Sequence, residues 1–148
     1  MFYEALSTRI FNFHDIMLII VIVQYFMLAL MLFLLKNQTN KANYFLAAIL
    51  LCNGFQSLDI IMIWSAELRP LILDWQPNLF FWGSLGYWLQ GPLLYCYVAS
   101  ILYKDFSLKP IYSLHLIPLV VVAILLMSQY HLLATEQKIA AMQNLSFM

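Results

Sequence analysis

The sequence predicts an all-α, polytopic membrane protein, with four transmembrane helices in a single domain over residues 1–148. Of the 148 residues, 64% are hydrophobic and only 9% are charged, whereas a soluble domain carries about 25% charged residues. The 16% aromatic share and the four Trp residues suit a protein that anchors at two membrane interfaces. Four apolar runs also approach or exceed the roughly 20 residues that a helix needs to cross a bilayer.

The N-terminal segment, residues 1–15, lacks the basic region and the cleavage site of a signal peptide. Apolar residues recur in it at helical spacing: Tyr3, Leu6, Ile10 and Phe13. The segment is therefore either a short helix lying in the membrane interface or a frayed tail. The first span covers about residues 16–35; Asp15 or Asn12 caps its start, and Lys36 closes its end.

The second span covers about residues 43–64 and follows the polar loop KNQTNKA. The next stretch, SAELRPLILDWQPN, carries two prolines and three charges and is predicted to be a loop. The third span covers about residues 79–103, which is long enough to tilt in the bilayer. After the loop KDFSLKP, the fourth span covers about residues 111–130, with Pro110 in its first turn. Residues 131–148 form a tail that could make a short amphipathic helix.

The distribution of Lys and Arg predicts the orientation in the membrane. The two short loops, after the first and third spans, hold four basic residues: Lys36, Lys41, Lys104 and Lys109. The opposite side holds three: Arg9, Arg69 and Lys138. We therefore expect the two short loops in the cytoplasm and both termini outside it.

Polar side chains interrupt the second span at NGFQSLD, and matching ones occur in the third span. Because the two spans run antiparallel, three pairs fall at similar depths: Asn53 with Gln90, Gln56 with Tyr87, and Asp59 with Ser84. Polar groups in hydrocarbon need a partner or a water-filled cavity. Residues three apart drift about 60° around a helix, so facing rows cross and we expect at most two of these pairs to form.

Two interpretations of this polar seam stay open. It either only holds adjacent helices together by hydrogen bonds, or it forms the wall of a small ligand or proton site with Asp59 as the titrating group. Small residues in the third span, Gly83, Gly86 and Gly91, are expected to let a neighbouring backbone come close.

Pro92 and Pro118 each remove a helical hydrogen bond, so we expect kinks in the middle of the third span and near the start of the fourth. His115 lies about one turn inside the fourth span, where it could bond to a freed carbonyl. Cys52 and Cys96 lie at different depths, so no disulfide is expected between them. The sequence contains no metal-ligand spacing, nucleophile–base pair or paired catalytic carboxylates, so we expect no metal, no cofactor and no enzymatic activity.

The run LQGPLLYCYVASILY, then a short basic loop and LHLIP, resembles the membrane-embedded sensor half of bacterial AraC-type transcriptional regulators. The pattern is a Gly-Pro-x-x-Tyr-x-Tyr helix followed by a His-x-x-Pro start to the next: Gly91, Pro92, Tyr95, Tyr97, His115 and Pro118. The resemblance covers most of residues 15–120. It implies a sensor or signal-transducing domain in the bacterial inner membrane. The DNA-binding half of those regulators is absent, so this chain is either a truncated product or a free-standing relative and is not expected to bind nucleic acid.

Three functions are therefore open. The first is a membrane sensor whose signal, a small apolar or envelope-derived molecule, is not identified by the sequence. The second is a small transporter or channel subunit that oligomerises and lines a pore with the seam residues. The third is a structural or accessory membrane protein with no ligand, which would associate with a partner membrane protein. In all three, the expected surroundings are the lipid bilayer.

Overall fold

The computed structural model describes residues 12–34, 41–103 and 105–144. The described part is all-α, and its six α-helices are α1 (Phe13–Leu34), α2 (Lys41–Trp64), α3 (Leu68–Trp75), α4 (Leu85–Leu102), α5 (Ile117–Leu126) and α6 (Thr135–Asn144). Three shorter helical segments join them: the 3-10 helices η1 (Pro77–Leu79) and η2 (Pro110–Leu116), and the π-helix η3 (Met127–His131). The predicted all-α fold class is confirmed.

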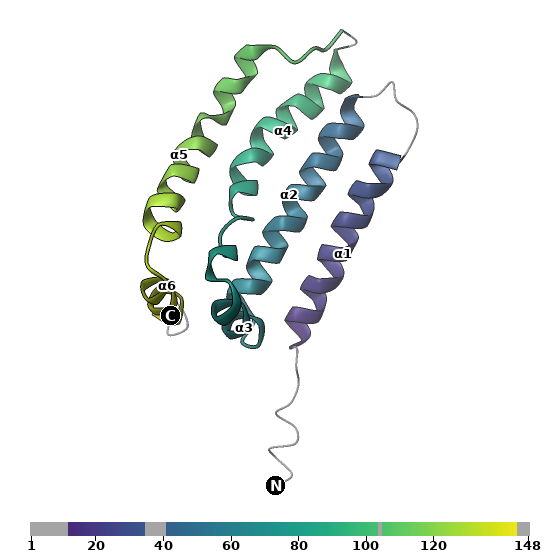
Figure 1. Ribbon diagram of the computed structural model, residues 1–148. Helices are drawn as coiled ribbons and strands as arrows, with labels where there is room; N and C mark the ends of the chain where they lie inside the picture. The colour runs from purple at the N-terminus through teal and green to yellow at the C-terminus, as the bar shows by residue number, and fades with distance from the viewer. Residues whose placement is uncertain (1–11, 35–40, 104, 145–148) are drawn as a thin grey trace.

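The long helices lie side by side in one layer, in the order α5, α4, α2, α1 (Figure 1). Tertiary contacts follow this order, because α1 packs on α2, α2 on α4, and α4 on α5. The short helices α3 and α6 lie at the end of the layer where α1 begins, and the connection from α4 to η2 lies at the other end. We call these the α3–α6 end and the η2 end.

Three helical stretches among the described residues are long and apolar enough to cross a membrane: Phe13–Leu34, Lys41–Trp64 and Pro110–His131. The most apolar part of the first is only 11% buried, and that of the third is 0% buried. Such apolar surface suits a helix that faces lipid, whereas a water-soluble domain would bury most of it. These stretches indicate a multi-pass membrane protein.

The predicted first and second spans correspond to α1 and α2, but the third begins later than expected. The predicted helix at 79–103 starts only at Leu85, because residues 80–84 form turns. The reason is that backbone N–H groups of this stretch bond to Asp59 of α2 instead of to carbonyls of their own helix. The resulting α4 has 18 residues and carries Gln90 and Pro92 in its interior.

The predicted fourth span consists of three consecutive helical segments of different type: the 3-10 helix η2, the α-helix α5 and the π-helix η3. Pro118 lies in the first turn of α5, where its missing N–H costs nothing, and the helix type changes there from 3-10 to α. The carbonyl of Leu114 accepts a hydrogen bond from the N–H of Ile117, three residues later, which makes the preceding turn 3-10. Pro92, by contrast, lies inside α4 as predicted.

Two segments outside the spans are helical. The stretch predicted to be a loop after α2 contains α3, which buries Leu73 against Phe80. The C-terminal tail contains α6, as predicted, and its Met142 joins the same apolar cluster. The predicted interfacial helix at the N-terminus lies almost wholly outside the described residues.

Candidate functional site

The polar seam between α2 and α4 is present, and two of its three predicted pairs form. Gln90 Nε2 donates a hydrogen bond to Asn53 Oδ1 at 2.8 Å. Ser84 Oγ donates to Asp59 Oδ2 at 2.9 Å. Both pairs join residues that antiparallel helices place at equal depth, so the count of residues along each helix was a sound guide to them.

The third predicted pair, Gln56 with Tyr87, does not form. The Tyr87 side chain is 53% exposed, and Gln56 Oε1 instead accepts a hydrogen bond from Gln90 Nε2 at 3.4 Å. Gln56 Nε2 is buried with no hydrogen-bond partner within the part of the chain that is described. The angular drift between residues three apart carries Tyr87 away from α2 while Gln90 faces it, as expected for crossing rows.

Asp59 organises the turn that precedes α4. Its carboxylate, only 3% exposed, accepts hydrogen bonds from Phe81 N at 2.9 Å, from Ser84 N at 2.8 Å and from Ser84 Oγ. A buried carboxylate needs such charge-assisted bonds, and the nearby start of α4 adds the partial positive charge of a helix N-terminus. Phe81 has φ 70°, a conformation that bulky residues rarely adopt, so these bonds hold a strained backbone.

Two glycines, one in the first turn of α4 and one in the turn before it, let this segment lie directly against the backbone of α2. A Cβ atom at Gly83 would collide with the carbonyl oxygen of Phe55, and a Cβ atom at Gly86 would lie 3.1 Å from the carbonyl oxygen of Cys52. Gly91 differs, because a Cβ atom there would meet nothing within 4 Å. The prediction of close approach is thus right for Gly83 and Gly86 and wrong for Gly91.

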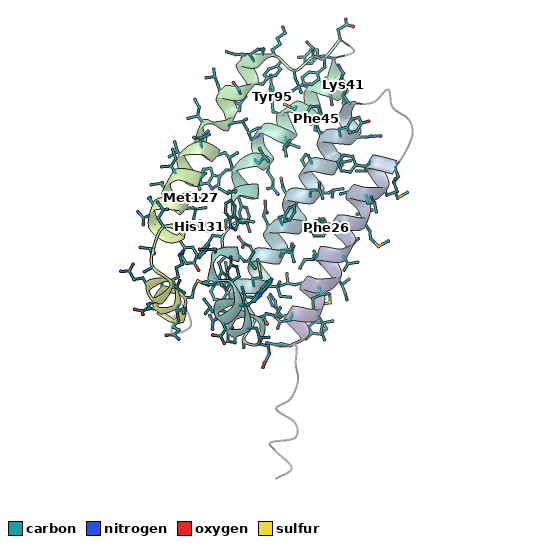
Figure 2. All side chains as sticks on the ribbon, in the orientation of Figure 1. Phe26, Lys41, Phe45, Tyr95, Met127 and His131 are labelled. Carbon is teal, nitrogen blue, oxygen red and sulfur yellow. The ribbon has the colours of Figure 1, made fainter. Side chains whose placement is uncertain are left out.

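A cavity of about 710 Å³ lies between α2, α4 and α5. Its walls are mostly apolar and include Phe55, Gly86, Leu89, Ala123, Ile124 and Met127; Figure 2 labels Met127 on the α5 side. Two lining side chains with hydrogen-bonding groups are already bonded: the Trp82 indole N–H donates to the Asn78 carbonyl at 2.8 Å, and Ser128 Oγ donates to the Leu125 carbonyl at 3.0 Å. We call this the apolar cavity.

A second hollow, of about 450 Å³, flanks the same seam. It is lined by Ile49, Asn53, Tyr87, Gln90, Gly91 and Leu94, none of which lines the apolar cavity. Three of these six residues carry hydrogen-bonding side chains. The seam is therefore a wall with an apolar cavity on one side and a more polar hollow on the other.

Two of the residues that carry the family resemblance meet at the η2 end. The rings of Tyr95 and His115 lie 5.4 Å apart, and those of Tyr95 and Tyr112 lie 5.6 Å apart. Tyr112 stacks on Phe106, whose carbonyl accepts a hydrogen bond from Lys41 Nζ at 2.8 Å; Figure 2 labels Lys41 and Tyr95 at this end. His115 thus contacts an aromatic ring, and not the freed carbonyl that the sequence suggested.

The other residues that carry the family resemblance do not lie beside Tyr95 and His115. Gly91 lines the second hollow, and Pro92 follows it inside α4. Tyr97 is half-buried in α4, and Pro118 begins α5. The pattern therefore marks two helices that face each other at one end, and it does not define one compact site.

Two buried polar links were not predicted. Ser65 Oγ donates to Asp15 Oδ2 at 2.9 Å, so Asp15 joins α1 to the end of α2 in addition to lying in the first turn of α1. Lys138 Nζ, on α6, donates to Asn78 Oδ1 and to the His131 carbonyl, both at 2.7 Å. Both links connect segments that are distant in sequence, and the sequence pattern contains no signal for such pairings.

Among residues 12–34, 41–103 and 105–144, no three His, Cys, Asp or Glu residues gather into a candidate metal site. Cys52 and Cys96 are buried free thiols. No protein-family model, curated protein or solved structure matches this chain. The resemblance to the membrane half of AraC-type regulators therefore stays a prediction.

Proposed function

We propose that this chain is a four-span membrane sensor domain that binds a small apolar molecule in the apolar cavity. The fourth span in this proposal is α4, which packs between α2 and α5, two helices of stretches long enough to cross a membrane. A helix held between two spanning neighbours lies at their depth. The Lys-rich loops and the resemblance to AraC-type regulators favour the bacterial inner membrane, with both termini outside the cytoplasm.

The observation that carries the proposal is the cavity itself. Its volume of about 710 Å³ lies within the roughly 300–1,000 Å³ that small-molecule sites occupy. Because the Trp82 and Ser128 side chains already donate to backbone carbonyls, the walls favour hydrocarbon over a polar ligand. Burial of apolar surface would supply the affinity, at about 25 cal/mol per Å².

Signal transduction would follow from the way α5 is attached. No residue of α5 is buried. Ring contacts join the stretch that contains it to α4, through Tyr95 and His115, and to the turn before α4, through Trp82 and His131 at 4.9 Å. The apolar cavity lies between these two contacts. A molecule there touches α4 and α5 together, so it would favour one spacing of the two helices over others.

The seam favours a sensor over the pore-forming alternative. In a pore, the amides of Asn53 and Gln90 would line a water path, whereas here Gln90 Nε2 donates to Asn53 Oδ1 at 2.8 Å. Paired amides hold α2 and α4 together as one rigid wall of the cavity. The helix α5, which has no buried residue, is then the wall that can move, whereas η3 is anchored by its buried Tyr130.

The test is saturable labelling of the apolar cavity by a photoreactive alkyl diazirine, with the protein in liposomes and the labelled residues located by mass spectrometry. Ala123→Trp places a large ring in the cavity, whereas Val121→Trp adds the same ring to a residue of α5 that does not line it. We expect saturable labelling of Ile124 and Met127 that is lost in Ala123→Trp and kept in Val121→Trp. Labelling that never saturates, and is equal in both variants, would mean that only bulk lipid occupies the cavity.

A further inference from the structure

The second hollow lies at the middle of α2. Asn53 is 12 residues from the start of that helix at Lys41, about 18 Å at the rise of an α-helix. The hydrogen-bonding side chains of the second hollow are therefore far from both ends of α2, which is long enough to cross a membrane. At such a depth, no bulk water is available to satisfy a polar group that lacks a partner.

Two hydrogen-bonding groups that line the hollow have no hydrogen-bond partner among the described residues. Asn53 Nδ2 donates to the Ile49 carbonyl at 3.0 Å, and Asn53 Oδ1 accepts from Gln90 Nε2 at 2.8 Å. Gln90 uses its N–H₂ group for that bond, and its carbonyl oxygen Oε1 accepts no hydrogen bond from a described residue. The Tyr87 hydroxyl likewise makes no hydrogen bond to a described residue, and its side chain is 53% exposed.

These two groups differ in what they need. Gln90 Oε1 can only accept a hydrogen bond, whereas the Tyr87 hydroxyl can donate one. A hydroxyl group is the smallest group that satisfies both, because it donates its proton and accepts with its oxygen. A ketone, an ester or an ether would satisfy Tyr87 alone.

We propose that this hollow binds the hydroxyl group of a membrane-soluble alcohol. The alcohol O–H donates to Gln90 Oε1, and its oxygen accepts from the Tyr87 O–H. The hydrocarbon part lies against Ile49 and Leu94, and Gly91 leaves the space that admits it, since a Cβ atom there would meet nothing within 4 Å. This site shares no lining residue with the apolar cavity, so it does not rest on the sensor proposal.

The test compares a photoreactive long-chain alcohol with its methyl ether, using the full chain in lipid nanodiscs. The ether keeps the acceptor and loses the donor, so we expect the alcohol to bind about three- to tenfold more tightly, the range that one hydrogen bond supplies. Tyr87→Phe should weaken alcohol binding by a similar factor. Its control is Tyr44→Phe, which removes the hydroxyl of another half-exposed tyrosine of the layer and should change nothing.

Gly91→Leu gives a second, steric test, because the Cβ of the new side chain enters open space and the side chain lies at the wall of the hollow. We expect it to abolish specific labelling by the alcohol and the ether alike. Equal affinities for the two probes, or full alcohol affinity in Tyr87→Phe, would overturn the proposal. So would efficient disulfide dimers of Gly91→Cys that the alcohol does not inhibit, because a second copy of the chain would then cover the hollow.

Discussion

Asp59→Asn tests whether one buried carboxylate holds the turn before α4. In the wild type, this carboxylate accepts hydrogen bonds from Phe81 N, Ser84 N and Ser84 Oγ at 2.8–2.9 Å. The Asn amide has nearly the same shape but replaces one acceptor oxygen with an N–H₂ donor. That donor would face a backbone N–H, so at least one hydrogen bond is lost and the others lose their charge assistance.

The magnitude follows from these bonds. An unsatisfied buried N–H costs about 1–3 kcal/mol, and a hydrogen bond to a charged group contributes about 1.5–3 kcal/mol. We expect Asp59→Asn to lower the free energy of unfolding by about 2–4 kcal/mol, within the range given by these two effects. Ser84→Ala removes only the hydroxyl bond and should cost about 1 kcal/mol.

Ser57→Ala is the matched control. Ser57 is buried on the same helix, but its Oγ donates only to the Asn53 carbonyl of that helix, at 2.9 Å. We expect a loss below about 1 kcal/mol. The assay is unfolding in mixed micelles, followed by circular dichroism, together with amide hydrogen exchange at Phe81 and Ser84. A loss in Asp59→Asn no larger than in Ser57→Ala, with unchanged exchange at those two amides, would refute the role of the carboxylate.

Two further variants test the packing. Gly83→Ala should destabilise the protein by more than about 2 kcal/mol, because its Cβ meets the Phe55 carbonyl oxygen, a backbone atom that cannot turn aside. Gly91→Ala is its control and should change the melting temperature little; similar melting temperatures for the two variants would contradict the contact between α2 and α4. Lys138→Met should speed amide exchange in α6 about tenfold or more, since it removes two hydrogen bonds of 2.7 Å to Asn78 and His131. Exchange in α1 is the internal control, and unchanged protection of α6 would mean that apolar contacts alone hold it.

The depth of the seam could be predicted, but the direction of its side chains could not. Depth along a helix grows linearly with residue number, so equal depth correctly paired Asn53 with Gln90 and Asp59 with Ser84. Direction around the helix depends on how two neighbours rotate against each other. The pairing of Gln56 with Tyr87, and the close approach at Gly91, failed for that reason.

The start of α4 shows how a tertiary contact overrides local preference. Residues 79–84, LFFWGS, are apolar and continuous with the helix that follows, so they were expected to be helical. The Asp59 carboxylate accepts hydrogen bonds from two N–H groups of this stretch, those of Phe81 and Ser84, which lie 22 and 25 residues later in the chain. No pattern within the stretch itself reports the presence of that acceptor.

The sequence by itself predicted that the chain is helical, that it has helices long and apolar enough to cross a membrane, and that its few polar side chains lie at matching depths in neighbouring helices. These properties depend on hydropathy and on counting residues along the chain. Only the tertiary structure decided the single layer of helices, the turn around Asp59 and the two hollows on either side of the seam. Each of these depends on contacts between residues far apart in sequence, and therefore on which helices become neighbours and which faces they turn toward each other.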